Sequence, residues 1–319
     1  MHALVTGGAG FVGSHLCDKL IERGYRVTAL DDLSTGRLEN VAHLDGNQEF
    51  ELVVGTILRP SLVDKLVERA DVVYHLAAAV GVNLIVEHPL ESMTTNIKGT
   101  EIVFEMSNRY RKKTLVTSTS EIYGKNADGP LREEDDRILG SPLKSRWSYS
   151  TAKALDEILA YIYFKQMKLP TVIVRLFNTV GPRQTGHYGM VVPRFVGQAV
   201  KGEAITVYGD GKQSRCFLCV HDCVAALVKL METPGAEGTV FNVGSSREIT
   251  IEGLAKKVIE ITGSTSEIRY IPYDEAYEEG FEDMERRVPD CGRAKELIGF
   301  EAKTTLEEII AMMIPEYRS

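Results

Sequence analysis

The sequence has little that would point to a nucleic-acid-binding, membrane or secreted protein. Its 319 residues hold no cluster of basic side chains and carry a formal net charge of -8, so nucleic acid is not expected as a partner. No apolar run reaches about 18 residues, so no membrane span is expected. The first residues, MHALVTGGAG, lack a basic stretch followed by an apolar one, so no signal peptide is expected either.

Cysteine is also scarce, and the five cysteines are an odd number. This count does not suggest a disulfide framework and favours a cytoplasmic, reducing location. Three of them, Cys216, Cys219 and Cys223, lie close together around His221, which are the atom types of a zinc site. However, the stretch alternates like a strand that enters a helix near Asp222, without the turn that tetrahedral ligation needs. We therefore expect buried thiols and no metal.

Short β-branched runs alternate with amphipathic helical patterns through the first two-thirds of the chain. The expected strands are HALVTG, YRVTALD, FELVVG, DVVYHLA, TLVTSTS and TVIVRLF. The expected helices cover Gly13–Arg23, Ser61–Arg69, Leu90–Tyr110 and Ser150–Met167. Continuous apolar strands alternating with helices predict an α/β fold with a doubly wound parallel sheet of the Rossmann type.

The pattern loosens after residue 178, where glycine, proline and arginine become frequent and the strands shorten. We predict a Rossmann domain over 1–178 and a smaller α/β substrate domain over 179–319. The segment TVFNVG (Thr239 to Gly244) reads as a strand that returns to the main sheet, so residues near 217–246 belong in part to the first domain. The charge run at 273–287 reads as solvated helix and loop.

A glycine-rich turn separates the first expected strand from the first expected helix. Gly7, Gly10 and Gly13 would let backbone N–H groups and the helix N-terminus approach a pyrophosphate. Asp31 ends the second strand roughly 20 residues on, the usual distance for a carboxylate that binds the adenosine ribose. A carboxylate there repels a 2′-phosphate, which favours NAD over NADP, although Arg37 lies nearby.

The segment YSTAK places Tyr149 and Lys153 one turn apart on one helix face. An ammonium at that distance is expected to lower the pKa of the phenol, which can then exchange a proton with a sugar hydroxyl. Thr119, at the end of the preceding strand, can give that hydroxyl a second hydrogen bond.

Together with VTGGAGFVGSHL, DDLSTG, TNIKGT, STSEIYG, RLFNTVGPRQ, ITVYGDGKQSRCF and RRVPD, these segments make the chain resemble the extended short-chain dehydrogenases/reductases that modify nucleotide sugars. The resemblance covers nearly the whole length. It implies a tightly held NAD that oxidises C4 of a nucleoside-diphosphate sugar and is then regenerated. Thr119, Tyr149 and Lys153 fall on the family's catalytic positions.

The resemblance also assigns binding residues. It places at the cofactor Phe11, Val12, Asp31, Leu33, Ser34, Gly36, Leu76, Ala77, Ala78 and Asn96, besides the three glycines, Tyr149 and Lys153. It places at the sugar nucleotide Asn178, Val192, Tyr208, Gln213, Arg215 and Arg287. Planar arginine forks suit a diphosphate, and Tyr208 suits stacking on a uracil ring, which favours a UDP-sugar. Where the family has Asp-Ile after the third strand, this chain has Thr56 and Ile57, so adenine contact is expected to be weaker.

The pair after Thr119 separates the chemistries within the family. Here it is Ser120 and Glu121, which resembles UDP-glucuronate decarboxylases. Oxidation of C4 of a glucuronate gives a β-keto acid, which loses CO2 readily. Arg215 is expected to hold the carboxylate or the developing oxyanion, and Glu121 to order the group that protonates C5.

Two alternatives stay open. In VGVNLIVEHP, Ile85 stands where these decarboxylases have a tyrosine, and the segment is more typical of 4-epimerases, which use the same Thr119, Tyr149 and Lys153. A non-catalytic NAD-binding sensor is the remote alternative, since fold does not fix function. The apolar stripes of the helices at 90–110 and 150–167 predict a homodimer.

Overall fold

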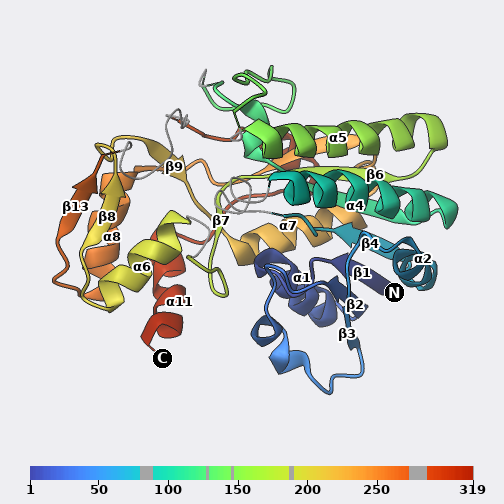
Figure 1. The fold of residues 1–319 in the computed structure, drawn as a ribbon, viewed down its shortest axis with the longest axis horizontal. Coiled ribbons are helices and arrows are strands. Elements are labelled where there is room, and N and C mark those ends of the chain that lie inside the picture. The colour runs from blue at the N-terminus through green and yellow to red at the C-terminus, as the bar shows by residue number, and fades with distance from the viewer. Residues whose placement is uncertain (80–88, 127–128, 145–146, 187–189, 273–285, 319) are drawn as a thin grey trace.

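The computed structural model describes residues 1–79, 89–126, 129–144, 147–186, 190–272 and 286–318. Figure 1 shows a larger part built around one sheet and a smaller part beside it, which contains the C-terminus. None of the helices in these segments combines the length and the apolar character needed to cross a membrane.

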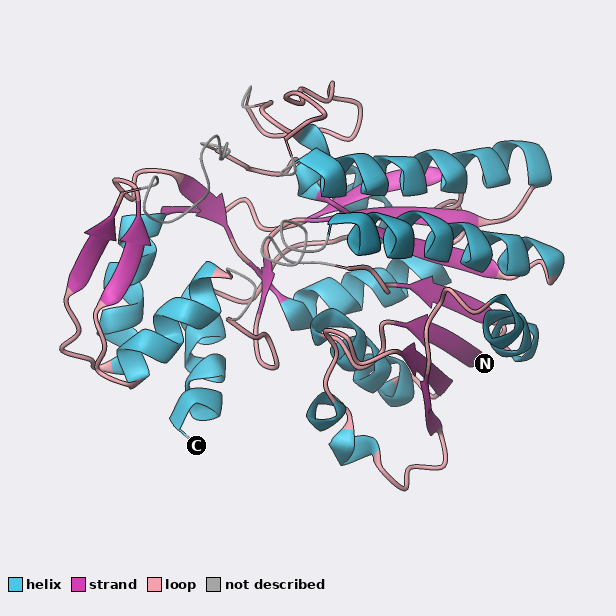
Figure 2. Ribbon diagram, viewed as in Figure 1, coloured by secondary structure: helices cyan, strands magenta, loops and turns pink. Residues whose placement is uncertain are grey.

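A seven-stranded sheet forms the centre of the larger part (Figure 2). Its order is β11-β6-β5-β4-β1-β2-β3, and every neighbouring pair is parallel. The strands are β1 (His2–Thr6), β2 (Arg26–Asp31), β3 (Phe50–Val54), β4 (Val72–His75), β5 (Lys113–Thr119), β6 (Thr171–Leu176) and β11 (Thr239–Val243). The chain starts in the middle of the sheet and builds outward to both edges, so the predicted doubly wound fold is confirmed.

Helices cover both faces of this sheet. One face carries α1 (Phe11–Glu22), α7 (Val220–Glu232) and α10 (Gly292–Ile298), and the other carries α2 (Pro60–Arg69), α4 (Pro89–Arg109) and α5 (Ser148–Met167). Strand β1 shows the division, because Ala3 and Val5 pack in the first core and Leu4 in the second. With both faces buried, the strands must be apolar at successive positions, which explains their continuous runs.

The smaller part has an apolar core of its own. Its helices are α6 (Val191–Val200), α8 (Ile251–Thr262) and α11 (Leu306–Arg318), and they pack around the parallel pair β8 (Ile205–Tyr208) and β13 (Ile268–Ile271). Two further short pairs are β7 (Thr179–Val180) with β10 (Leu218–Cys219), and β9 (Ser214–Cys216) with β12 (Glu248–Thr250). Three 3-10 turns, η1 (Leu38–Asn40), η2 (Ala42–Leu44) and η3 (Ser120–Tyr123), complete the elements.

Two segments from the second half return to the main sheet. Strand β11 pairs with β6 at one edge, and α7 packs against α1. The return predicted from TVFNVG is therefore confirmed. The division of the chain near residue 178 stays a prediction, and most of the charge run, 273–285, lies outside the described residues.

Candidate active site

The glycine-rich turn joins β1 to α1 at the carboxyl edge of the sheet. Gly7 has φ +74°, and a Cβ there would lie 2.8 Å from the backbone nitrogen of Ala77. A Cβ on Gly13 would lie 1.9 Å from the carbonyl oxygen of Gly7. Side chains are therefore excluded from the turn, and the N-terminus of α1 stays open to an anion such as a pyrophosphate.

Asp31 is the last residue of β2 and is buried beside this turn. Its two carboxylate oxygens accept hydrogen bonds from the N–H groups of Ala9 and Leu33, each at 2.9 Å. Burial raises the pKa of Asp31, and these backbone hydrogen bonds oppose that shift. A Cβ on Gly36 would lie 2.6 Å from the same carboxylate. The carboxylate suits ribose hydroxyls and would repel a 2′-phosphate.

A cleft runs along this edge of the sheet. Of the residues predicted for the cofactor it is lined by Gly7, Gly10, Phe11, Val12, Gly13, Asp31, Ser34, Ile57, Leu76, Ala77 and Ala78. The other residues predicted for the cofactor are not among its lining residues; they are Leu33, Gly36, Thr56, Asn96, Tyr149 and Lys153. Asn96 orients the segment after β4, because its Oδ1 accepts the N–H of Ala79 at 2.7 Å. The Thr56 hydroxyl accepts the N–H of Leu58 at 3.2 Å. The glycine cradle and the acid at its end fit a dinucleotide.

The sequence patterns missed several lining residues. They are Leu30, Asp32, Thr35, Gly55, Ala79, Glu91, Ser92, Thr95, Gln184, Thr185 and Met190. Most come from the segment after β4, from α4 and from the loop after β7, none of which carries a glycine signature. The usable signal was topological, because the carboxyl ends of neighbouring parallel strands meet at one edge and their following loops line one crevice.

The predicted catalytic residues gather at the other end of this edge. Thr119 ends β5, and its hydroxyl accepts a hydrogen bond from the N–H of Glu121 at 3.2 Å. This bond caps the N-terminus of η3. Helix α5 begins at Ser148, two residues before its predicted start, so Tyr149 lies in its first turn and Lys153 in its second. The Lys153 ammonium lies 2.8 Å from the Asp156 carboxylate, with both side chains almost fully buried.

The expected lowering of the Tyr149 pKa is wrong for these contacts. Burial raises the pKa of Tyr149, and the negative charges of Glu121 and Asp156 raise it further. The main reason is burial of the phenol, and the sequence analysis also did not consider the two acids, one of which, Asp156, forms an ion pair with Lys153. These contacts favour the protonated form of Tyr149.

Arg287 lies in the same group of residues. Its Nη1 donates to the Ser120 hydroxyl at 3.1 Å and lies 2.9 Å from Glu121 Oε1. The Arg287 and Glu121 side chains are 6% and 17% exposed. Arg287 was predicted in a sugar-nucleotide motif, but nothing in the sequence paired it with Glu121. The structure places a cation, a carboxylate and a hydroxyl directly after Thr119.

The remaining predicted substrate residues surround β8 and β9. The Tyr208 ring lies 4.0 Å from the guanidinium of Arg194, a residue that the sequence analysis missed. Gln213 donates from Nε2 to the Tyr208 carbonyl at 3.1 Å, and Arg215 donates from Nη1 to the Ser214 carbonyl at 2.7 Å. Their sugar-nucleotide roles stay predictions.

Two further predicted residues are held in the structure itself. The Asn178 amide donates to the Cys216 carbonyl at 3.0 Å, which ties the end of β6 to β9. Val192, in α6, is completely buried in the core of the smaller part. The segment with Ile85 lies outside the described residues.

The cysteine cluster consists of buried thiols, as predicted. Cys216 and Cys219 lie on β9 and β10, and Cys223 on α7, so the expected strand-to-helix transition is confirmed. Burial raises the pKa of the Cys223 thiol to about 12. Over the described segments, no three His, Cys, Asp or Glu side chains are grouped so that they could hold a metal ion.

A glycine-lined cleft at the carboxyl edge of a parallel sheet, with Thr119 at the end of β5 and Tyr149 and Lys153 on α5, is typical of a dehydrogenase/reductase of the extended short-chain type. The family model described as GDP-mannose 4,6 dehydratase matches residues 4–313, and the chain belongs to this family. A Bacillus cytotoxicus UDP-N-acetyl-alpha-D-glucosaminuronate decarboxylase is 39% identical over 316 residues, which are 99% of this chain and 97% of that protein. A Xenopus tropicalis UDP-glucuronic acid decarboxylase 1 is 36% identical over 317 residues, 99% of this chain and 72% of that protein.

Solved structures with this fold include two 4-epimerases. The Thermotoga maritima UDP-glucose 4-epimerase, solved with UDP-glucose, superposes with a TM-score of 0.89 at 33% identity, over 100% of this chain and 99% of that one. The Bacillus cereus UDP-glucuronic acid 4-epimerase, solved with UDP-glucuronic acid and NAD, gives a TM-score of 0.89 at 28% identity, over 99% of each chain.

Proposed function

We propose that this enzyme is an NAD-dependent decarboxylase of a UDP-linked glucuronate, acting through a transient 4-ketone. The observation that carries the proposal is the contact of Arg287 with Glu121 and Ser120 directly after Thr119. Relatives named as decarboxylases at 36–39% identity over nearly the full chain support it. One of them is named for the N-acetylated sugar, so we propose glucuronate, with or without a C2 N-acetyl group, as the substrate class.

The glycine turn and Asp31 would hold the cofactor. Bound NAD supplies the oxidation of C4 and the later reduction of the C4 ketone. In the protein, the phenolate form of Tyr149 takes the proton of the C4 hydroxyl as C4 is oxidised, and the phenol that results returns the proton at the end, while Thr119 hydrogen-bonds the same oxygen. Lys153 lies one turn away and stabilises the charge that passes through Tyr149.

Decarboxylation itself needs a cation at the sugar carboxylate and an acid near C5. In the 4-keto acid the C5–C6 bond breaks, CO2 leaves, and its electron pair forms the enolate of C4 and C5. Arg287 has five N–H donors, enough to keep Glu121 and also bind the carboxylate and then the enolate oxygen. Glu121 orders the water or hydroxyl that protonates C5. The predicted role of Arg215 at the carboxylate stays a prediction beside that of Arg287.

The test is proton NMR of the NAD-loaded enzyme with UDP-glucuronate and, separately, with UDP-N-acetylglucosaminuronate, in D2O. We expect a UDP-pentose that carries deuterium at C5, with release of CO2. A Tyr149→Phe variant is the control and should lose at least ~100-fold in rate, since it lacks the proton-transfer group. A hexuronate product with inverted C4 and no CO2 would overturn the proposal.

The runner-up is a 4-epimerase, and one observation favours it. The superposed Bacillus cereus structure is a 4-epimerase solved with UDP-glucuronic acid, and the reaction would use the same Thr119, Tyr149 and Lys153. The 4-keto sugar would then rotate in the site, and C4 would be reduced on its other face. The deuterium experiment separates the two, because epimerisation at C4 leaves C5 untouched.

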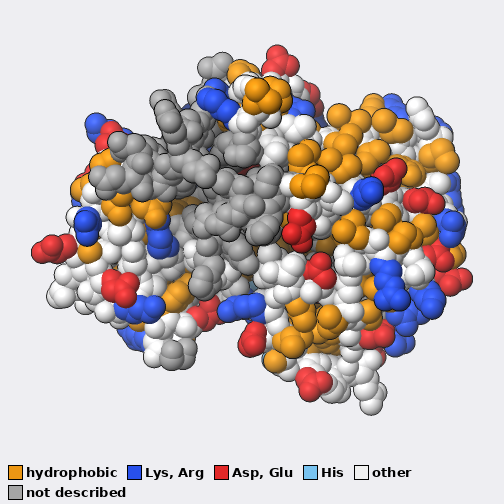
Figure 3. Space-filling view, viewed as in Figure 1, with side chains coloured by type: hydrophobic (Ala, Val, Ile, Leu, Met, Phe, Trp, Pro, Cys, Tyr) orange, Lys and Arg blue, Asp and Glu red, His pale blue; other side chains and the backbone are white. Residues whose placement is uncertain are grey.

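We also propose a homodimer and a cytoplasmic location. Apolar side chains gather over α4 and α5 in Figure 3. Ile158, Tyr161 and Ile162 belong to α5, and they are 51%, 47% and 40% exposed. A surface of this kind fits a contact between two copies. Sedimentation at micromolar concentration should give twice the chain mass, and Ile158→Lys should give the monomer. The location rests on the free thiols, which fit a reducing compartment.

A further inference from the structure

The ion pair of Lys153 with Asp156 is the least expected contact at the catalytic end. The two groups lie three residues apart on α5 with a separation of 2.8 Å, and their side chains are 3% and 0% exposed. Removing a carboxylate and an ammonium from water is costly, and a buried pair is often no more stable than packed apolar side chains. An ion pair at this position therefore calls for a role other than stability.

The helix geometry places three groups in line. Tyr149 and Lys153 are four residues apart, and Asp156 follows three residues later, so all three lie along one face of α5. The carboxylate is thus close enough to act on the phenol through its charge. Burial and this charge, together with that of Glu121, raise the pKa of Tyr149. An ammonium without a counter-ion would act in the opposite direction.

The other ionisable groups near this site either form ion pairs with other residues or are neutral. Glu157, the next residue of α5, is bound to Arg175 of β6 at 2.8 Å. Glu121, in η3, lies 2.9 Å from Arg287. His75, on β4, is kept neutral, because burial and the Lys153 charge lower its pKa to about 3. Among the described residues, Asp156 is the carboxylate in contact with Lys153.

Given the proposed function, we propose that Asp156 is a positioning residue, which anchors the Lys153 ammonium on α5 and balances its charge beside the Tyr149 hydroxyl. Asp156 touches no reacting atom in this role. It limits how strongly Lys153 favours the phenolate of Tyr149, so that the phenolate is basic enough to take the C4 proton and the phenol then holds that proton until it is given back. This reversible use of one proton is what a reaction that oxidises and then reduces the same carbon requires.

The test compares Asp156→Asn with Glu157→Gln, which removes a buried carboxylate from the next position of the same helix. The first readout is kcat for CO2 release against pH. We expect the acidic limb of the Asp156→Asn profile to move down by about one pH unit, since one nearby negative charge is gone. We expect no movement for Glu157→Gln. A uniform loss of rate at every pH, with the limb unmoved, would overturn the proposal.

A second readout does not depend on which sugar is the substrate. In NAD-loaded enzyme containing [ζ-13C]tyrosine, the Tyr149 signal is assigned by its absence in Tyr149→Phe and is titrated in each variant. The signal should titrate at lower pH in Asp156→Asn than in the unaltered enzyme, and an unchanged midpoint contradicts the proposal. Failure of the proposed decarboxylation would leave this result intact. If Asp156→Asn does not fold, Asp156→Ser, which leaves room for a water, is measured in the same way.

Discussion

Two buried arginine–glutamate pairs serve different ends in this molecule. Arg175 and Glu157 lie between β6 and α5, with each side chain 9% exposed, and form a bidentate contact at 2.9 and 2.8 Å. The third nitrogen of Arg175, Nη1, donates to the Tyr123 hydroxyl at 2.8 Å and to the Glu133 carbonyl at 2.9 Å. Every nitrogen of this guanidinium is therefore used within the protein.

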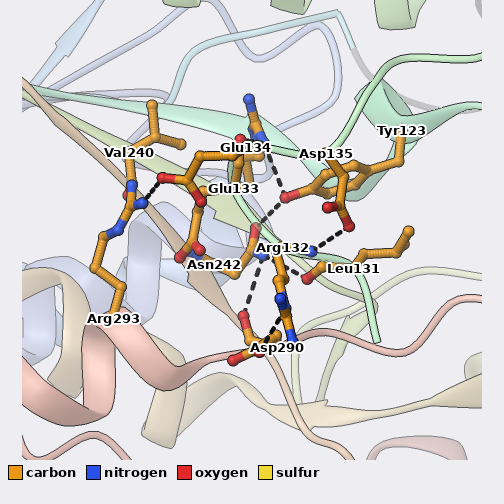
Figure 4. A network of polar contacts seen from close by, with 11 residues as sticks. Tyr123, Leu131, Arg132, Glu133, Glu134, Asp135, Val240, Asn242, Asp290 and Arg293 are labelled. Atoms are coloured by element: carbon orange, nitrogen blue, oxygen red, sulfur yellow. Dashed lines mark hydrogen bonds and ion pairs between the residues drawn. The ribbon is translucent and has the colours of Figure 1, made fainter. Parts of the chain in front are cut away.

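The hydrogen bonds continue beyond this pair, as Figure 4 shows. Tyr123 donates to Oδ1 of Asn242 at 2.7 Å, and the Asn242 amide donates to the carbonyls of Leu131 and Asp290 at 2.9 and 3.1 Å. Segments that are distant in the sequence, from η3, β6, β11 and the chain before α10, are joined in this way. We call this network the brace; it consists of Arg175, Glu157, Tyr123 and Asn242 and joins these segments of the fold.

Arg287 and Glu121 form the other kind of pair. Arg287 Nη1 lies 2.9 Å from Glu121 Oε1 and also donates to the Ser120 hydroxyl, and these contacts directly follow Thr119 at the end of β5. Both pairs combine burial and charge, so neither property separates them. The catalytic role proposed for Arg287 and Glu121 rests on their position at the carboxyl end of a parallel strand, next to other reactive groups.

Arg175→Met should have the largest effect, and it tests whether the Arg175–Glu157 pair serves stability alone. It leaves Glu157 buried without its cation, and we expect a loss of about 3–5 kcal/mol in the free energy of unfolding. Urea unfolding measures this loss. Activity per folded molecule should stay within about threefold, because the brace does not touch the reacting sugar. A larger loss of activity in fully folded protein would make the two pairs alike.

Glu121→Gln is the matching change in the other pair. The amide keeps a hydrogen-bond acceptor for Arg287 but can no longer help protonate C5. We expect CO2 release to fall by about 10²–10³-fold. The loss of stability should be smaller than for Arg175→Met, since the amide oxygen still accepts from Arg287 and the Glu121 side chain is more exposed. Glu157→Gln serves as the control, and a CO2 rate within threefold of the unaltered enzyme would remove Glu121 from the mechanism.

His15 extends the comparison to a buried group that is neutral in the folded protein, in contrast to the charged arginine–glutamate pairs. Its Nε2 lies 3.0 Å from the Pro182 carbonyl, and burial lowers the pKa of His15 to about 4. The unfolded chain therefore binds more protons between about pH 6.5 and 4, so stability is full above 6.5 and falls as the pH falls through this window. The loss should approach about 3 kcal/mol. A His15→Asn variant should lose less stability than the unaltered protein between pH 7 and pH 4.5 in urea titrations, with the remaining slope carried by groups such as His75.

Tyr123→Phe makes the smallest change, within the brace. It leaves Oδ1 of Asn242 without its donor and removes one acceptor from Arg175, while the ring keeps its packing. We expect a loss of about 1–3 kcal/mol in the free energy of unfolding. The midpoint of thermal unfolding measures it. No loss at all would show that water replaces the hydroxyl and that the brace is held by Glu157 alone.

Much of the fold and the cofactor cleft could be predicted because their signals are local. Gly13 is required by the Gly7 carbonyl within the same turn, Gly7 has a positive φ in that turn, and Asp31 follows at a fixed distance along the chain. The return of β11 was visible as one apolar run. These features depend on residues close in the sequence.

The pairings within the catalytic end could not be predicted, for two different reasons. Ser120 and Arg287 are 167 residues apart, and only the folded chain brings them together. Asp156 is a different case, since its place three residues after Lys153 was readable from helical spacing. It was missed because the helix was treated as a carrier of Tyr149 and Lys153, without asking which other acids share their face.

The return of β11 to the sheet has a consequence for how the protein must be made. Strand β6 ends at Leu176, but its neighbour β11 begins at Thr239, after much of the smaller part. During synthesis the open edge of β6 is thus left without its native partner while the intervening residues emerge from the ribosome. An unpaired, apolar strand edge is a template for misassociation. The central sheet is therefore complete only after β11 has been synthesised, and until then the edge of β6 is open to misassociation.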